Sequence, residues 1–238
     1  KLEFEALSHV EQYAVDLKWG MPEMRHLLAE RVAGYLKRMG NKHLTYLANL
    51  PQNRPTRDER LISLVFESSM LWGKNGATRP PHVPLATLSR HRPRWMIELA
   101  KQAAKSAIEK HHPVITLEDM ISKLMAFGER RIMDTVAEFK PQCQQIHEVI
   151  TAFHNQREDY STSELIDTIK RRVLPAVSVR IEGFPYQPDA RGIAAFLFYV
   201  GFLTARGDLP WEIHPVFRQA LGLRTKEGFE VHRRDRKR

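Results

Sequence analysis

Cysteine is almost absent from this 238-residue chain, because Cys143 is the only one. A single cysteine cannot form an internal disulfide, and it cannot build a zinc site from thiolates. The sequence therefore fits a reducing compartment, and we expect a cytoplasmic location. Two neighbouring histidines, His111 and His112, do not replace the missing ligands, because adjacent side chains at a helix end point apart. We expect no metal site in this chain.

Long hydrophobic runs are missing as well. The longest uncharged apolar run, 192–205, is shorter than the roughly 20 residues that a membrane-spanning helix needs. No signal-peptide pattern opens the chain. We therefore expect a soluble protein without membrane contact. The first residue is Lys1 rather than methionine, and the opening residues form no obvious starting element, which leaves open that the chain is a piece of a longer protein.

The common catalytic signatures do not occur. The phosphate-binding loop G-x-x-x-x-G-K-[ST] is absent, because Gly73 and Lys74 lack both the leading glycine and the following hydroxyl residue. The patterns H-E-x-x-H, G-x-S-x-G and G-x-G-x-x-G are missing too. We therefore expect no catalytic residue here, and this stretch alone cannot cradle the phosphates of ATP.

Positive charge, in contrast, is abundant. The chain has 37 Lys and Arg residues against 28 Asp and Glu residues, which gives a formal net charge of +9. A positive field attracts phosphate-rich partners, so nucleic acid is the first candidate, beside acidic protein and nucleotides. The end of the chain carries a compact cluster of cations with too few apolar residues to pack. This cluster consists of Arg233, Arg234, Arg236, Lys237 and Arg238.

The pattern of apolar residues predicts a mainly α protein with a helical lid-like bundle over 1–140. Within this region 73–84 is expected to be a loop, because it holds two glycines and three prolines. Thr116 is a candidate N-cap before a long helix, which Gly128 could divide. The expected helices of the region are 8–17, 20–40, 56–72, 93–110 and the long helix after Thr116.

The region 141–223 has a different character, with shorter helices and a β-element at its end. A helix is expected at 145–154, and Ser161 with Glu164 forms a capping box that opens the next. A strongly apolar third helix follows at 189–200, and then a hairpin whose turn contains Gly207. Three helices followed by a hairpin are the order of a winged-helix domain. A basic tail, 224–238, completes the chain.

Arginines crowd the start of the expected helix at Pro93. Arg90, Arg92 and Arg94 lie where the helix dipole favours negative charge, so a bound phosphate or acidic neighbours must compensate them. This segment, followed by an Ala-rich helix and by Val-Ile-Thr-Leu-Glu-Asp before the next helix, resembles the lid of AAA+ and STAND-type P-loop ATPases. The alternative interpretation is that the arginines only pair with acidic residues of the lid.

Other segments extend the resemblance. The sequence at 196–203 and 213–218 is similar to the winged helix of such ATPases, and 19–31 is similar to the segment after the ATPase core in bacterial defence-associated members. The resemblance implies that Arg94, or else Arg92, senses the γ-phosphate of a nucleotide. It further implies ATP with magnesium in the intact protein, and a P-loop core in the same polypeptide or in a separate chain.

The third helix of the expected winged helix has no side chain suited to reading bases, because 192–203 lacks Arg, Lys, Asn and Gln. We expect this helix to be buried in its own domain or against a partner. Any nucleic-acid binding should then be electrostatic and tolerant of sequence. The candidate phosphate contacts, besides the cluster at the end of the chain, are Lys170, Arg171, Arg172, Arg191 and Arg206.

The leading hypothesis from the sequence is therefore a nucleotide-sensing lid joined to a winged-helix interaction module of a larger ATPase in bacterial antiphage defence. Two other classes remain open. One is a stand-alone winged-helix protein that binds nucleic acid. The other is a scaffold or oligomerisation subunit whose apolar third helix docks another protein.

Overall fold

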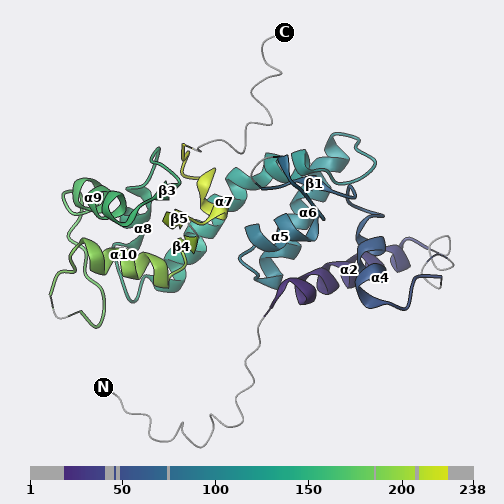
Figure 1. The fold of residues 1–238 in the computed structure, drawn as a ribbon, viewed down its shortest axis with the longest axis horizontal. Helices are drawn as coiled ribbons and strands as arrows, with labels where there is room; N and C mark the ends of the chain where they lie inside the picture. The colour runs from purple at the N-terminus through teal and green to yellow at the C-terminus, as the bar shows by residue number, and fades with distance from the viewer. Residues whose placement is uncertain are drawn as a thin grey trace, which may run out of the picture.

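The computed structural model confirms a mainly α fold with small antiparallel sheets (Figure 1). It describes residues 19–40, 46, 49–73, 76–184, 186–206 and 209–224. The helix expected at 8–17 and nearly all of the basic tail lie outside the described residues.

The elements follow one another in an order close to that expected from the sequence. The helices are α2 (Met21–Arg38), α4 (Arg54–Ile62), α5 (His82–Leu88), α6 (Pro93–Glu109), α7 (Leu117–Phe139), α8 (Ile146–Thr151), α9 (Thr162–Arg172), α10 (Ala190–Tyr199) and α11 (Pro215–Arg218). The strands are β1 (Met70–Leu71), β2 (Thr78–Arg79), β3 (Asp159–Tyr160), β4 (Leu203–Arg206) and β5 (Leu209–Ile213).

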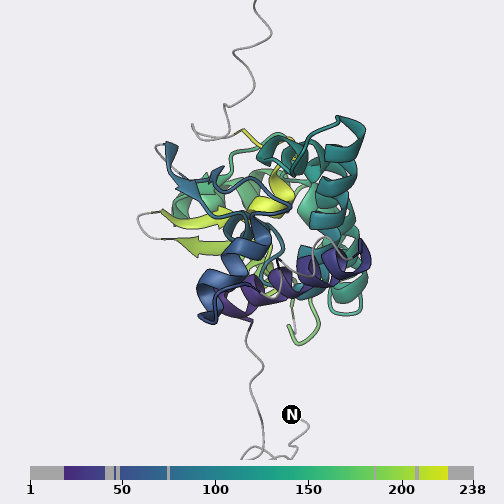
Figure 2. The same ribbon diagram turned by 90° about the vertical axis from the view of Figure 1, so that its right-hand side faces the viewer.

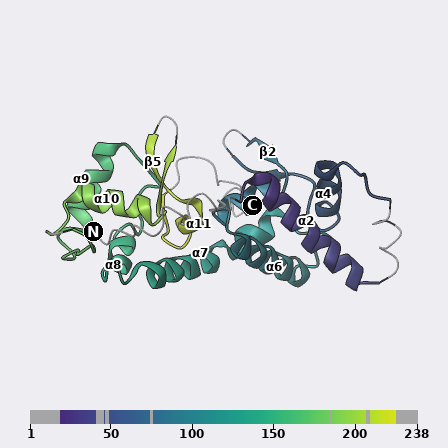
Figure 3. The ribbon, with the colours of Figure 1, turned by 90° about the horizontal axis from the view of Figure 1, so that it is seen from below.

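The molecule has two lobes joined by the long helix α7 (Figures 1 and 3). The first lobe holds α2 to α6 with β1 and β2, and the second holds α8 to α10 with β3 to β5. Viewed along the long axis, the hairpins β1–β2 and β4–β5 project on the same side (Figure 2). A single cluster of buried apolar residues runs through both lobes, so their relative position is fixed by packing.

The predicted helix at 56–72 is wrong beyond Ile62, where α4 ends. The chain then turns, Phe66 bridges to Ile115, and Met70 enters β1. Phe66 and Met70 are both buried, as their helical spacing indicated, but they are buried through a turn and a strand. In this segment the pairing of β1 with β2 therefore decides the structure, although the apolar residues are spaced as in a helix.

The predicted loop at 73–84 is interrupted by the strand β2, which begins at Thr78 and pairs with β1, and it ends at His82. From His82 the chain is helical again, and Pro84 lies in the first turn of α5. A proline is tolerated there because the first N–H groups of a helix have no carbonyl partner within it.

Helix α7 is continuous through Gly128, so a break at this glycine is not observed. Its start is confirmed, because Thr116 and Asp119 form a capping box. Gly128 serves close packing instead. A Cβ at this position would lie 2.5 Å from the carbonyl oxygen of Val216, so the missing side chain lets the segment around α11 approach α7.

The second lobe has the order helix, strand, helix, helix and hairpin. Its sheet has the strand order β3-β5-β4 with antiparallel neighbours. The capping box of Ser161 and Glu164 at the start of α9 is confirmed, and so is the hairpin β4–β5. Asp189 caps α10 through a hydrogen bond from the Gly192 N–H of 2.8 Å.

Within this chain the third helix is buried on one face only, so burial in its own domain holds for that face, and burial of the other face against a partner stays a prediction. One face of α10 is buried, including Phe196, but Ala195, Phe198 and Tyr199 are exposed. Phe198 is 47% and Tyr199 67% exposed. The reason is that α9 and β4 pack on one side of α10 only, which leaves an apolar stripe uncovered.

None of the helices in the described part of the chain combines the length and the apolar character needed to cross a bilayer.

Candidate anion-binding groove

A groove of about 920 Å³ is lined by residues of α2, α6 and α7, of which α6 packs against both of the others. Positive side chains dominate it, with six cations against two carboxylates. The cations are Arg31, Arg92, Arg94, Lys101, Arg130 and Arg131, and the carboxylates are Glu98 and Asp134. We call it the arginine groove. It brings together both predicted sensor residues, Arg92 and Arg94, with four cations that the sequence interpretation did not select.

The two carboxylates of the groove are already neutralised by arginines. Glu98 accepts a hydrogen bond from Arg130 and forms an ion pair with Arg131, whose Nη2 lies 3.1 Å from Glu98 Oε2. Arg131 also contacts Asp134 at 3.1 Å. The groove therefore offers no free carboxylate to a magnesium ion among its described residues, whereas its excess of cations suits phosphate oxygens.

Three cations of the groove have no charged or hydrogen-bonded partner among the residues that the structure describes. They are Arg31 on α2 and both Arg94 and Lys101 on α6. All three are exposed. Arg94 and Lys101 are seven residues apart, so they lie on the same face of α6 about two turns from each other. An anion in the groove would therefore find cations that need not leave another partner.

The N-terminus of α6 opens at the groove without a neutralising group. Arg92 is its N-cap residue, no side chain caps the helix, and its first turn contains no acidic residue. The first N–H groups of a helix carry a partial positive charge and bind anions readily. The dipole and the arginines thus favour negative charge at the same place.

Arg92 and Arg94 differ in their surroundings. Arg92 contacts Glu138 at 3.3 Å, and its guanidinium lies 4.5 Å from the ring centre of Trp95. Arg94 is exposed and has no such partner among the residues that the structure describes. The alternative interpretation, in which arginines pair with acidic neighbours, therefore holds for Arg92 and not for Arg94. This difference favours Arg94 as the residue open to a ligand.

Arg131 is the deepest cation of the groove, with 2% of its surface exposed. Its Nε and Nη1 atoms are buried and have no hydrogen-bond partner. The guanidinium lies 4.6 Å from the ring centre of Trp95 and 4.8 Å from that of Phe127. Contact with two aromatic rings stabilises a buried cation, but it gives these two N–H groups no acceptor.

The predicted nucleic-acid contacts of the second lobe lie apart from this groove. Lys170, Arg171 and Arg172 occupy the last turn of α9, where positive charge also complements the helix dipole, and Arg191 lies at the start of α10. All four are exposed. The side chain of Arg206 and the whole cluster Arg233, Arg234, Arg236, Lys237 and Arg238 lie outside the described residues.

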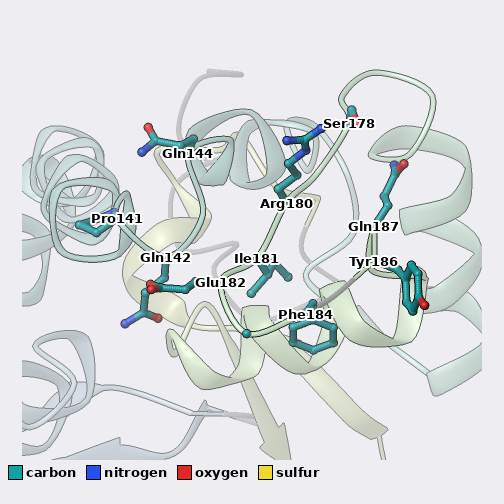
Figure 4. A pocket seen from close by; sticks show the side chains of 11 residues that line it. Pro141, Gln142, Gln144, Ser178, Arg180, Ile181, Glu182, Phe184, Tyr186 and Gln187 are labelled. Carbon is teal, nitrogen blue, oxygen red and sulfur yellow. The ribbon is translucent and has the colours of Figure 1, made fainter. Parts of the chain in front are cut away.

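A second hollow, of about 570 Å³, lies beside the segment that leads from α9 to α10 (Figure 4). Phe184 and Tyr186 line it together with several polar side chains. Arg180 and Glu182 are its charged residues, so it has no net charge. This hollow therefore lacks the character of a phosphate site.

His111 and His112 have different surroundings. His111 is exposed, and the Nδ1 atom of His112 lies 2.9 Å from a carboxylate oxygen of Asp119. Within the described ranges no group of three or more His, Cys, Asp or Glu residues could hold a metal ion.

Comparison with protein-family models, with curated proteins and with solved structures finds no match to this chain. The interpretation of the groove therefore depends on its geometry and charge.

Proposed function

We propose that the chain is a nucleotide-sensing lid joined to a winged-helix interaction module, and that it works with a P-loop ATPase core in the same polypeptide or in a separate chain. The observation that carries the proposal is the arginine groove. Arg94 is exposed and has no partner there among the described residues, beside the open N-terminus of α6. Resemblance to defence-associated ATPases adds bacterial antiphage defence and a cytoplasmic location to the proposal.

In this proposal the chain supplies binding and sensing rather than chemistry. The nucleotide and its magnesium are held by the ATPase core, and Arg94 reaches the terminal phosphate as the core and lid approach. Arg92 is the second candidate, because it must first leave Glu138. Preorganised cations at a helix N-terminus stabilise phosphate charge at little cost in reorganisation.

A titration of the full chain with inorganic tripolyphosphate tests the groove directly. Isothermal calorimetry at low salt should detect binding, and Arg94→Ala should raise the Kd about tenfold, because a charge-assisted hydrogen bond contributes about 1.5 to 3 kcal/mol. Lys105→Ala is the matched control, since Lys105 lies on α6, is exposed and does not line the groove. Equal affinities for Arg94→Ala and the unmodified chain would overturn the assignment.

The exposed surface of the second lobe is better suited to binding a partner protein than to reading DNA bases. The exposed stripe of α10 consists of Ala195, Phe198 and Tyr199 beside Arg191, and apart from Arg191 and the Tyr199 hydroxyl it offers apolar surface rather than hydrogen-bonding groups. A scaffold role is therefore the second candidate function. A stand-alone nucleic-acid-binding protein is the third, and it depends on the exposed cations of α9 and on phosphate contacts alone.

A further inference from the structure

Arg90 extends out of the first lobe into the second. It precedes Arg92 by two residues, yet its Nη2 donates a hydrogen bond of 3.2 Å to the carbonyl oxygen of Val200, which ends α10. The same guanidinium lies against Gly201. A Cβ on Gly201 would come within 1.6 Å of Nη2, so a glycine is required at this contact. Gly201 also has a φ of +70°, which disfavours other residues.

The turn that carries Arg90 has a strained backbone, and its side chains form hydrogen bonds to both lobes. Arg90 and His91 have φ values of 54° and 53°, and two consecutive left-handed residues other than glycine are costly. Arg90 is held at Val200, and His91 Nδ1 lies 3.0 Å from the carbonyl oxygen of Trp19, just before α2. These contacts hold the turn in a conformation that its sequence does not favour.

Trp95 connects this turn with the arginine groove. Its ring is almost buried, and three guanidiniums surround it. Arg92 lies 4.5 Å and Arg131 4.6 Å from its centre, and both line the groove. Arg90 lies 5.9 Å from the same ring and 6.0 Å from that of Phe217 in α11. The three cations therefore share one aromatic surface, and they repel one another.

Because of this repulsion, an anion bound in the arginine groove would change the strength of the hydrogen bond between Arg90 and Val200. Burial, together with the charge of Arg92, lowers the pKa of Arg90 to about 10. The position of Arg90 is therefore unfavourable for the positive charge of its guanidinium. An anion bound by Arg92 or Arg94 would reduce that cost. The hydrogen bond from Arg90 to Val200 would then be stronger when the groove is occupied.

We infer that Arg90 transmits occupancy of the arginine groove by a polyphosphate anion to the turn after α10, by strengthening its contact with Val200 and Gly201. The inference depends on the proposed function, because it needs a phosphate ligand in the groove. It adds to that function a chain of contacts, through Arg90, by which a ligand in the first lobe would stabilise the turn after α10 in the second lobe. Since coupling between two sites is reciprocal, a partner that fixes this turn would also tighten anion binding.

Hydrogen exchange of the full chain, with and without saturating tripolyphosphate, tests the route. The amides of Gly201 and Phe202 report on the turn, because they donate to the carbonyl oxygens of Phe198 and Leu197 at 2.9 Å each. In the unmodified chain, tripolyphosphate should slow their exchange about fivefold or more. In Arg90→Lys, which keeps the charge but not the planar donor group, tripolyphosphate should still bind while this slowing is lost.

A matched pair of glycine variants gives an independent test. Gly201→Ala displaces the guanidinium of Arg90, whereas Gly183→Ala, with a φ of +86° and no atom within 4 Å of the added Cβ, imposes a similar backbone strain without touching it. The anion-dependent slowing should persist in Gly183→Ala and disappear in Gly201→Ala. If Gly201→Ala does not fold, Arg90→Lys decides the question.

The outcomes separate the two proposals. Absence of tripolyphosphate binding to the unmodified chain would overturn the proposed function and the route with it. Binding that leaves the exchange of Gly201 and Phe202 unchanged would overturn the route alone. Slowing that survives in Arg90→Lys would also overturn the route alone.

Discussion

Arg131 lies with its guanidinium 4.6 Å from the ring centre of Trp95, at the base of the arginine groove. The two residues come from different helices, α7 and α6, and both are almost completely buried. Two ion pairs, with Glu98 and Asp134, offset the cost of burying the charge of Arg131. This arrangement makes Arg131 part of the core of the first lobe, so this one cation is held in place before any ligand arrives, whereas Arg31, Arg94 and Lys101 are exposed.

The two faces of α10 should respond differently to truncation. Phe196 is 6% exposed, so Phe196→Ala should lower the free energy of unfolding by about 3 to 5 kcal/mol. Phe198 is half exposed and its main ring contact is an edge contact with Trp211 at 5.6 Å, so Phe198→Ala should cost only about 1 kcal/mol. Urea denaturation measures both. Equal losses would contradict the observed burial of α10.

Replacing either of two helical glycines by alanine should change the stability of the protein, in opposite directions for the two positions. A Cβ on Gly34 of α2 meets nothing within 4 Å, so Gly34→Ala should stabilise the protein by about 0.5 to 1 kcal/mol. A Cβ on Gly128 of α7 would lie 2.5 Å from the Val216 carbonyl oxygen, so Gly128→Ala should destabilise it by about 1 to 3 kcal/mol. Thermal melting compares them. Stabilisation by Gly128→Ala would show that α11 does not pack closely on α7.

Stability should fall as the pH drops below about 6.5, because His214 must stay neutral. Burial, with smaller effects of the charges of Arg90, Arg218 and His91, lowers the pKa of His214 to about 3. The folded pKa is thus below the ordinary value of 6.5, so the unfolded state takes up the proton first as the pH falls. Stability is fully present above pH 6.5 and decreases below it by up to about 1.4 kcal/mol per pH unit.

The variant His214→Asn isolates this effect, since its amide oxygen can still accept the hydrogen bond that His214 Nδ1 receives from the Val216 N–H. Its unfolding free energy should depend less on pH between 6.5 and 4 than that of the unmodified chain. Part of the dependence should remain, because burial also lowers the pKa of His82 to about 4. Chemical denaturation at a series of pH values measures this, with exposed His154→Asn as control. Identical pH profiles for His214→Asn and the unmodified chain would refute the assignment.

Nucleic-acid binding, where it occurs, should be insensitive to sequence. The exposed face of α10 has apolar residues where base-reading groups would be needed, so affinity must come from phosphate contacts. Replacing Arg171 and Arg172 by alanine, or removing 233–238, should weaken binding to two unrelated duplexes by the same factor. It should also reduce the slope of log affinity against log salt by about one unit per lost contact. Fluorescence anisotropy measures both quantities, and a marked preference for one duplex would contradict the prediction.

Local chemistry explains which parts of the fold could be predicted. The N-cap Thr116 and the capping box of Ser161 and Glu164 were predicted correctly, because a cap and the residue that it pairs with lie three residues apart in the sequence. The hairpin β4–β5 was predicted from its turn. The helix at 56–72 was mispredicted because its later residues pair with β2, a contact that local spacing does not reveal.

The arginine groove was only partly visible in the sequence. Arg92 and Arg94 could be selected because they lie at a helix start. Arg31 gives no local signal, since it joins the site only when α2 packs beside α6, whereas Lys101 could have been found from its helical spacing to Arg94. Arg131 could have been found, because it follows Phe127 by four residues on the buried face of α7 and is a charged residue at a core position.

Amide chemical-shift mapping of the full chain during a titration with ATP tests directly whether the arginine groove binds a nucleotide. Tripolyphosphate, titrated in parallel, separates the contribution of the phosphates. We expect the largest shifts at Arg94 and Trp95 at the start of α6 and at Arg31 of α2, with weaker shifts at Arg90 and Gly201. Shifts confined to the last turn of α9 and to Arg191, with none at α6, would contradict it.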